Sequence, residues 1–428
     1  MSSEESSSAS VDPSDTLPAS AQRDRVGFAA YRDLPRTAGW AYLAATSLGR
    51  LPLSMVPLAI LTLASAATGS IAVGGIAAAA AAVGEAAGAP LAGAITDRRG
   101  QRPVLLIGVV LHVAALLAFC AAAGSAPDTL TVLLAALAGL ALPQVGPLSR
   151  ARWLVIAPRH QHVAFAFEGV VDEVVYIVGP ALVGLIAVTT GAASAVVASG
   201  ALVAVFVTWF AVHPSHRLVP RRRARARSGR FEGAPASAAR ARLLIGVAFA
   251  GALAMGIFFG GSQTGLTSFA DEQGISGAGP LLYAVMAVGS AVTTLAMVAV
   301  PARIGPWIRW TVAGAGLTAG SLLLLFAEHT GTVVVAGLVA GAFQGPLLLT
   351  MFSVSGSVTE EGRGGIVMTF TASGIVLGLA VGTTVAGLLA ERFGSGGAFA
   401  VVVAVAAVQL LLGAGMQLAT AQRRASRA

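Results

Sequence analysis

The stretch from residue 71 to residue 123 decides the fold that we expect. It reads IAVGGIAAAAAAVGEAAGAPLAGAI at 71–95, TDRRGQR at 96–102 and PVLLIGVVLHVAALLAFCAAA at 103–123. A helix needs about 20 apolar residues to cross the hydrocarbon core of a bilayer, and both apolar runs are long enough. The short charged segment between them is where the chain returns to water. The stretch therefore predicts two membrane-spanning helices joined by a tight, basic turn.

The composition of the whole chain is typical of a membrane protein. Hydrophobic residues make up 56% of the 428 residues, and charged residues only 11%. Because soluble domains carry about 25% charged residues, this chain lacks the polar surface that a cytosolic enzyme or a secreted domain needs. Its single cysteine, Cys120, excludes an internal disulfide.

Twelve apolar runs of sufficient length follow one another along the chain. They are continuously apolar and do not alternate with polar residues, which favours helices over the strands of a membrane barrel. The sequence therefore predicts an all-α membrane protein with twelve transmembrane helices. The expected spans are 39–64, 71–95, 103–123, 129–149, 164–188, 192–213, 242–262, 279–300, 310–327, 332–354, 366–390 and 397–418.

The longest polar loop divides these spans into six and six. We expect an N-terminal six-helix bundle at 39–213, a basic cytoplasmic linker at 214–241 and a C-terminal six-helix bundle at 242–418. The Ser-rich segment 1–38 reads as a disordered cytoplasmic tail with no cleavable signal peptide, and 419–428 as a second tail.

The net charge of +8 comes from arginine alone, because the sequence contains no lysine. With these spans, 25 of the 27 arginines fall in loops and tails on one side, Arg392 lies on the other, and Arg50 lies inside the first span. Basic loops stay in the cytoplasm, so we expect both termini inside, in the cytoplasmic membrane. Charge that records orientation in this way does not indicate a nucleic-acid partner.

Weak self-similarity supports a six-plus-six repeat, an arrangement common among membrane carriers. Three pairs of short motifs lie in corresponding spans or loops at offsets of 205, 199 and 203 residues. The pairs are Arg98-x-Gly100 with Arg303-x-Gly305, Gly146-Pro147 with Gly345-Pro346, and Gly179 and Gly184 with Gly382 and Gly387.

The turn after the second span resembles the signature loop of the major facilitator superfamily, G-x-x-x-D-R/K-x-G-R-R/K. The matching residues are Gly93, Asp97, Arg98, Gly100 and Arg102, whereas Gln101 stands where the family usually has a basic residue. The resemblance implies a transporter of two six-helix bundles that rock about a midplane cavity, opening it to each side in turn.

The resemblance also implies a role for the loop's aspartate. In the family this residue latches the two halves together while the carrier is open to the outside. Gly93 permits close helix approach, and Gly100 suits a turn with positive φ. Because the eleventh span begins near residues 364–365 on the same side, its positive helix end is the expected partner of Asp97.

The fifth span partly resembles a motif of drug/proton antiporters, which ends in Gly-Pro-x-x-Gly-Gly. Here Gly179, Pro180 and Gly184 form a shorter version of it. An arginine inside the fourth helix, upstream of a glycine, is another antiporter feature, and we expect Arg150 at the end of that helix instead. The comparison suggests antiport.

Ionisable residues inside a bilayer are costly and therefore indicate function. We expect five of them in the N-terminal half, namely Arg50, Glu85, Glu168, Asp172 and Glu173.

Three residues of the fifth span, Glu168, Asp172 and Tyr176, follow a spacing of four and share one helix face. Arg50 is the only cation expected at their depth, and it pairs with Asp172 or Glu173, depending on the rotation of the helix. Such a carboxylate either exchanges a proton during transport or forms a permanent salt bridge.

Two further residues complete the candidate site. Glu85 is either a second partner of Arg50 or a separate proton site. Gln344 of the tenth span, together with Arg50 and Tyr176, is expected to line the substrate cavity.

From these observations we expect proton-coupled export of a small apolar or amphipathic compound, of the multidrug-efflux type. The alternatives are uptake or export of a polar metabolite such as a sugar or amino acid and, more remotely, a membrane-embedded enzyme. No phosphate-binding loop or metal-ligand pattern occurs in the sequence, so we expect no metal or cofactor, and the proton gradient as the energy source. The expected partners are the substrate, protons and the lipid bilayer, and the expected oligomeric state is a monomer.

Overall fold

A computed structural model describes residues 28–158, 160–219, 235–275, 278–301, 303–357 and 363–425. Residues 1–27 of the expected tail and residues 220–234 of the expected linker lie outside the described residues. Residues 28–38, which we expected in the disordered tail, instead form the helices η2 (Phe28–Asp33) and α2 (Leu34–Ala38). They are ordered because Leu34 is buried and the Tyr31 hydroxyl donates to the Leu295 carbonyl at 3.0 Å.

The described chain has the predicted fold class. Eleven of its helical stretches are long and apolar enough to cross a membrane. The longest, Gly364–Gln422, contains two helices that meet at Gly394, where φ is 64°. The described residues therefore supply twelve membrane-crossing helices, and the sequence prediction is confirmed.

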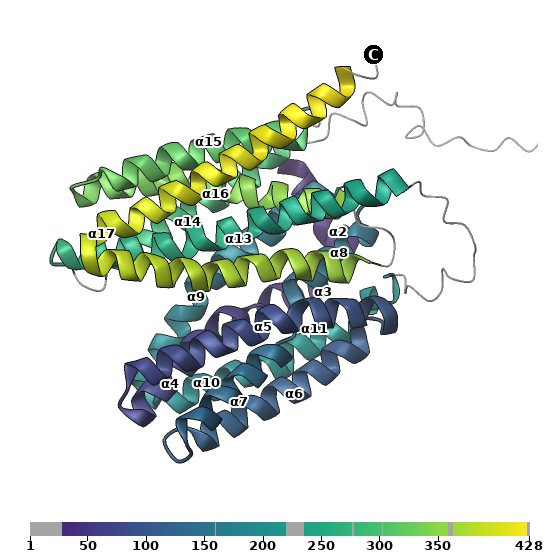
Figure 1. Cartoon of the computed structure of the whole chain (residues 1–428). Coiled ribbons are helices and arrows are strands. Elements are labelled where there is room, and N and C mark those ends of the chain that lie inside the picture. The colour runs from purple at the N-terminus through teal and green to yellow at the C-terminus, as the bar shows by residue number, and fades with distance from the viewer. Residues whose placement is uncertain are drawn as a thin grey trace, which may run out of the picture.

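The first six membrane helices form one bundle, drawn in purple to teal in the lower part of Figure 1. Helices 1 and 4 are each broken into two pieces, and helix 6 contains a π-helical turn. The elements are α3 (Trp40–Leu48) with α4 (Leu51–Thr68), α5 (Ile71–Arg99), α6 (Gln101–Ala122), α7 (Asp128–Ala141) with α8 (Val145–Ile156), α9 (Gln161–Thr190), and α10 (Ala192–Leu202) with η3 (Val203–Val207) and α11 (Thr208–Val212).

The remaining helices form the second bundle, in teal to yellow (Figure 1). A short turn, η4 (Pro214–Arg217), precedes it. The elements are α13 (Pro235–Glu272), α14 (Gly279–Ala296) with η5 (Met297–Ala299), α15 (Pro306–Leu325), α16 (Thr330–Ser357) and α17 (Gly364–Ala425).

Helix 4 is longer than the sequence predicted. Its candidate span runs over Asp128–Ile156, and Arg150 and Arg152 are 3% and 0% exposed within it. The expectation that both arginines lie in a loop was therefore wrong. Hydropathy alone ends the predicted span at its first charged residue. Charged residues that pair inside the protein can nevertheless lie within a membrane helix.

The two bundles meet along a few helices. α5 packs against the beginning of α17, α8 also contacts α17, and α9 packs against α14 and α16. We call the end of the molecule where α5 ends and α17 begins the arginine-rich end, because Arg98, Arg99 and Arg102 are exposed there. It lies at the right of Figure 1.

Gly93 allows the close approach of α5 and α17. A β-carbon at this position would lie 2.1 Å from Thr369 Oγ1 and 2.7 Å from the Gly365 carbonyl oxygen. Both distances are shorter than van der Waals contact, so any larger residue must push the two bundles apart.

We predict that Gly93→Ala opens the arginine-rich end, whereas Gly75→Ala in the same helix has no effect, because a β-carbon at Gly75 meets no atom within 4 Å. Spin labels on cysteines at Thr129 and Glu328 would report the change in a Cys120→Ser background. Both sites are exposed, one on each bundle, at the end opposite the arginine-rich end. When two bundles rock against each other, opening one end closes the opposite end. The distance between the two labels should therefore be shorter in Gly93→Ala than in the wild type. Identical distance distributions in the two variants would show that this contact does not control closure.

Candidate functional site

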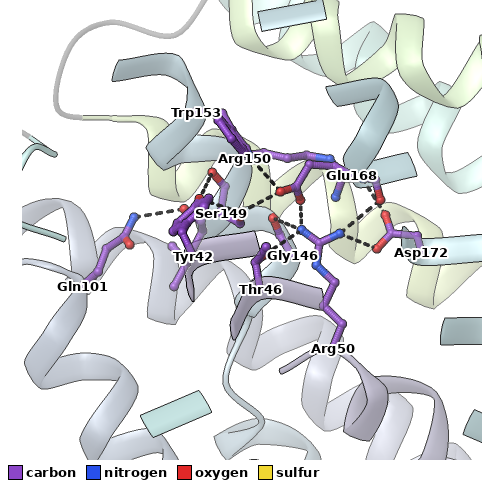
Figure 2. A network of polar contacts seen from close by, with 11 residues as sticks. Tyr42, Thr46, Arg50, Gln101, Gly146, Ser149, Arg150, Trp153, Glu168 and Asp172 are labelled. Carbon is purple, nitrogen blue, oxygen red and sulfur yellow. Dashed lines mark hydrogen bonds and ion pairs between the residues drawn. The ribbon is translucent and has the colours of Figure 1, made fainter. Parts of the chain in front are cut away.

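Two arginines and two acids from three parts of the N-terminal bundle form one ion-pair network centred on Arg50 (Figure 2). Arg50 lies at the break between α3 and α4, Arg150 lies on α8, and Glu168 and Asp172 lie one turn apart on α9. Arg50 forms an ion pair with Glu168, and its Nη1 donates to Asp172 Oδ1 at 2.9 Å. Arg150 Nη2 donates to Asp172 Oδ2 at 2.5 Å. The four charges compensate one another.

Backbone and hydroxyl groups complete the surroundings of Arg50. Its Nη1 donates to the Glu168 carbonyl at 3.1 Å, and its Nη2 donates to Thr46 Oγ1 and to the Gly146 carbonyl, both at 3.4 Å. A buried ion pair is stable only when hydrogen bonds of this kind replace the lost water. The guanidinium is thus fixed in place with 1% of its surface exposed.

Glu168 is held by neutral donors as well as by Arg50. Its Oε1 accepts from Ser149 Oγ at 2.7 Å and from Trp153 Nε1 at 2.6 Å. The Ser149 hydroxyl also shares a 2.7 Å hydrogen bond with the Tyr42 hydroxyl (Figure 2). Glu168 is therefore a fully buried, fully partnered anion that joins α3, α8 and α9.

Two expectations about the pairing of Arg50 are now resolved. The sequence left Asp172 and Glu173 as alternatives, and the structure places Asp172 and Glu168 on Arg50. The expectation that Arg50 is the only cation at this depth was wrong, because Arg150 is a second one. The signal for it was present, since apolar residues resume after Arg152 and continue to Ile156.

Arg150 also touches the other bundle. Its guanidinium carbon lies 4.0 Å from the centre of the Phe352 ring on α16. A cation over an aromatic face is attracted by the ring electrons. The charge network of the N-terminal bundle therefore extends to the C-terminal bundle through this contact.

Glu173 differs from its neighbours on α9 because it faces neutral groups of the other bundle. Ser290 Oγ on α14 donates to Glu173 Oε1 at 2.5 Å, and Gln344 Nε2 on α16 donates to the same oxygen at 2.9 Å. Glu173 is 8% exposed and forms no ion pair with any residue that the structure describes. Glu173 is thus a buried acid that lies between the bundles and has no cationic partner in the described part of the chain.

The other expected site residues are distributed over separate places. Glu85 is 4% exposed, and its hydrogen-bond partner is Gln144 Nε2, at 3.5 Å, next to the break in helix 4. Tyr176 is partly exposed. Arg50 and Gln344 do not form one group, because the first belongs to the ion-pair network and the second to Glu173. No cluster of metal ligands occurs among the described residues.

The signature loop reaches across to the second bundle. Asp97 Oδ1 accepts the backbone N–H of Gly365 at 2.9 Å, and its Oδ2 accepts the N–H of Ile366 at 3.0 Å. These groups belong to the first turn of α17, where free N–H groups and the helix dipole attract an anion. Gly100 has φ of 90°, which explains the glycine. Arg98 and Arg102 are exposed at the surface.

Gln101, where the loop departs from the family pattern, has a partner of its own. It is 2% exposed, its Oε1 accepts from Arg152 Nε at 2.7 Å, and its Nε2 donates to the Leu148 carbonyl. Arg152 also donates to the Phe210 carbonyl and to Ser215 Oγ. A basic residue at position 101 would repel Arg152, so the glutamine and the buried arginine fit together. The local sequence pattern does not predict this pair, because the two residues lie 51 positions apart.

The helix-5 motif contributes packing between α9 and α4. A β-carbon at Gly179 would lie 1.9 Å from Ser54 Oγ, whereas one at Gly184 meets no atom within 4 Å. Pro180 lies inside α9. Of the two glycines, only Gly179 is required by a close contact.

We predict that Asp97→Asn weakens closure of the arginine-rich end and reduces transport without preventing membrane insertion. Asparagine keeps one acceptor oxygen but loses the negative charge. The attraction between that charge and a helix N-terminus is worth about 1 kcal/mol, so its loss should change the population of the closed conformation roughly fivefold. The Thr129–Glu328 distance would measure it, with Glu391→Gln, an exposed acid at the opposite end, as the control. Wild-type closure and full activity in Asp97→Asn would remove the latch role.

Comparisons with known proteins agree with this architecture. The model of the Major Facilitator Superfamily matches residues 42–336. The chain therefore belongs to this superfamily, and it is a secondary transporter of small molecules. No curated protein is a significant sequence match.

Solved structures of transporters share the fold at low sequence identity. The human organic anion transporter MFSD10 (TETRAN) matches with a TM-score of 0.68 and 17% identity, over 89% of this chain and 99% of that one. The transporter FucP in the outward conformation matches with a TM-score of 0.63, 16% identity and coverages of 88% and 99%. The proton:xylose symporter XylE bound to 6-bromo-6-deoxy-D-glucose matches with a TM-score of 0.62, 14% identity and coverages of 87% and 94%.

Proposed function

We propose that this protein is a proton-coupled exporter of small apolar or amphipathic molecules. The observation that carries the proposal is the environment of Glu173. Within the described residues this buried acid is hydrogen-bonded to a hydroxyl and an amide of the opposite bundle and to no cation, whereas Glu168 and Asp172 on the same helix face arginines.

The neutral surroundings make Glu173 a better proton carrier than Asp172. Protonating Asp172 would leave Arg50 and Arg150 with an excess of buried positive charge, which is costly in a low dielectric. A hydroxyl and an amide, by contrast, are uncharged, so protonating the acid beside them leaves no excess positive charge. Glu173 therefore gains and loses a proton without leaving an unpaired arginine behind.

In this proposal the ion-pair network positions Glu173. Asp172 and Glu173 are adjacent on α9, so their side chains point in different directions around the helix. The two arginines hold Asp172 on the N-terminal bundle, and this fixes the rotation that directs Glu173 towards α14 and α16. The network remains charged throughout the cycle.

The substrate class follows from the shortage of polar groups in the membrane. A polyhydroxylated sugar needs many hydrogen-bond donors and acceptors, yet the sequence contains no asparagine, and α14 and α16 contain no Asp, Glu, Lys or Arg. Two polar side chains that these helices offer, Ser290 and Gln344, are already bonded to Glu173. These features favour an apolar or amphipathic substrate over a polar metabolite.

The proposed orientation places the arginine-rich end in the cytoplasm. The Asp97 contact with α17 then closes the cytoplasmic side in this conformation, and protons reach Glu173 from outside. Proton entry down its gradient would drive export of the substrate in the opposite direction.

We predict that the wild-type protein increases the tolerance of a transporter-depleted bacterium to amphipathic toxic compounds, and that a protonophore abolishes the effect. Glu173→Gln should lower uphill export by roughly 5- to 150-fold, the usual range of a coupling free energy. It should retain exchange of labelled for unlabelled substrate in counterflow, because exchange requires no net proton movement. Export by the wild type should rise as the external pH falls.

Two results would contradict this account. One is uphill, protonophore-sensitive export by Glu173→Gln at the wild-type level, with equal amounts of protein in the membrane. The other is counterflow of sugars or amino acids with no transport of amphipathic compounds, which would favour the polar-metabolite alternative.

A further inference from the structure

The contact between Glu173 and Gln344 contains an unsatisfied atom. Gln344 donates through Nε2 to Glu173 Oε1, but its own Oε1 is buried and has no hydrogen-bond partner among the residues that the structure describes. Buried polar atoms are nearly always bonded, so each exception requires an explanation. An amide has two donors and one acceptor oxygen, and here the acceptor lacks a donor.

Neutral carboxylic acids and amides form a pair that satisfies both groups. The amide N–H donates to one carboxyl oxygen, and the acid O–H donates back to the amide oxygen. The first of these two bonds is present between Gln344 and Glu173. An ionised Glu173 has no proton for the second bond and would instead direct a negative oxygen at the amide oxygen.

We propose that Glu173 is protonated in this conformation and that Gln344 is the residue that detects the proton. The proton comes from water, forms an O–H bond on Glu173, and is bonded to Gln344 Oε1. No other covalent bond changes, and the proton returns to water when the contact opens. The inference rests on the proposed function, because it assigns the coupling proton to the same acid.

Loss of the proton then separates the bundles at this point. The carboxylate and the amide oxygen repel each other, and the carboxylate draws water into the contact. The rest of the surface between the two bundles here is formed by α9 against α14 and α16. The proton-loaded acid therefore stabilises the conformation that is closed at the arginine-rich end, and proton release favours the opposite one.

Ser290 plays a different part from Gln344. Its hydroxyl donates to Glu173 Oε1 in the structure, and a hydroxyl serves an ionised or a neutral acid equally. The two residues are held together by close packing, since a β-carbon at Gly345 would lie 1.9 Å from Thr294 Oγ1 and 2.6 Å from Ser290 Oγ. Ser290 should therefore strengthen the contact without making it dependent on pH.

Other titratable groups surround this contact, and none of them forms an ion pair with Glu173 in the described chain. On α9 itself they are His162, Glu168, Asp172 and Tyr176. On the elements packed against α9, or at their ends, they are Tyr31, Arg32, Asp33, Tyr42, Arg50, Arg150, Arg152 and Tyr283, while α4, α10, α16 and η5 carry none.

The test measures the Thr129–Glu328 label distance over a pH series, without substrate and without a gradient. In the wild type, the ratio of the two conformations should change with pH by up to about tenfold per pH unit, the limit for one linked proton. Acid should favour the conformation described here. In Glu173→Gln the ratio of the two conformations should not depend on pH, because the amide is neutral and supplies a donor throughout the series.

Variants of Gln344 separate detection from packing. Gln344→Met, apolar and of similar length, should weaken the pH dependence, because the acid proton loses its acceptor while burial alone still disfavours the ionised acid. Gln344→Glu should retain the full pH dependence, because two facing carboxyl groups still need one shared proton. Ser290→Ala should lower the population of the closed conformation and keep its pH dependence. Wild-type pH dependence in Gln344→Met or Glu173→Gln would overturn the proposal.

The measurement also distinguishes this inference from the proposed function. A pH-dependent distance that Gln344→Met weakens, in a protein whose export does not depend on the proton gradient, would support the contact and refute proton coupling. Export that needs the gradient and Glu173, with a label distance independent of pH, would refute the contact alone.

Discussion

The site depends on one guanidinium group, that of Arg50, held between two carboxylates of α9 inside the membrane. Arg50 and Glu168 are almost completely buried, so bulk water does not stabilise their charges. Arg50, Glu168 and Asp172 therefore stabilise one another. Arg150 adds a second positive charge and completes the compensation. Through these residues the broken helices 1 and 4 and the continuous α9 become one rigid unit, which fixes how α9 presents its next residue.

That next residue, Glu173, connects the charge network to the motion of the bundles. Two contacts between the bundles are electrostatic in different ways. Asp97 binds the N-terminal turn of α17 with a fixed charge. Glu173, in contrast, is an acid that contacts Ser290 and Gln344 and forms no ion pair with any described residue. A fixed charge gives a constant preference for closure, and a titratable one makes closure depend on proton supply. Together they give a physical route from a proton gradient to alternating access.

Much of the fold could be predicted from the sequence because lipid imposes a simple requirement of length and apolarity. That requirement located twelve helices, and the signature loop indicated that Asp97 faces the start of helix 11. Local patterns could not show the partners of charges. The sequence predicts a loop at Arg150 and Arg152 because both are charged, and their stabilising partners Phe352, Asp172 and Gln101 lie outside the local pattern. The choice of Asp172 over Glu173 as partner of Arg50 depended on the rotation of α9, which packing against other helices determines.

The central claim is that Glu173 carries a proton at the boundary between the bundles. Infrared difference spectroscopy of the purified transporter, recorded between acidic and alkaline pH, tests it most directly, because a protonated carboxyl group has its own C=O stretching band. The account predicts a band from a buried carboxylic acid that disappears in Glu173→Gln and persists in Asp172→Asn. A band that is unchanged in Glu173→Gln would contradict it.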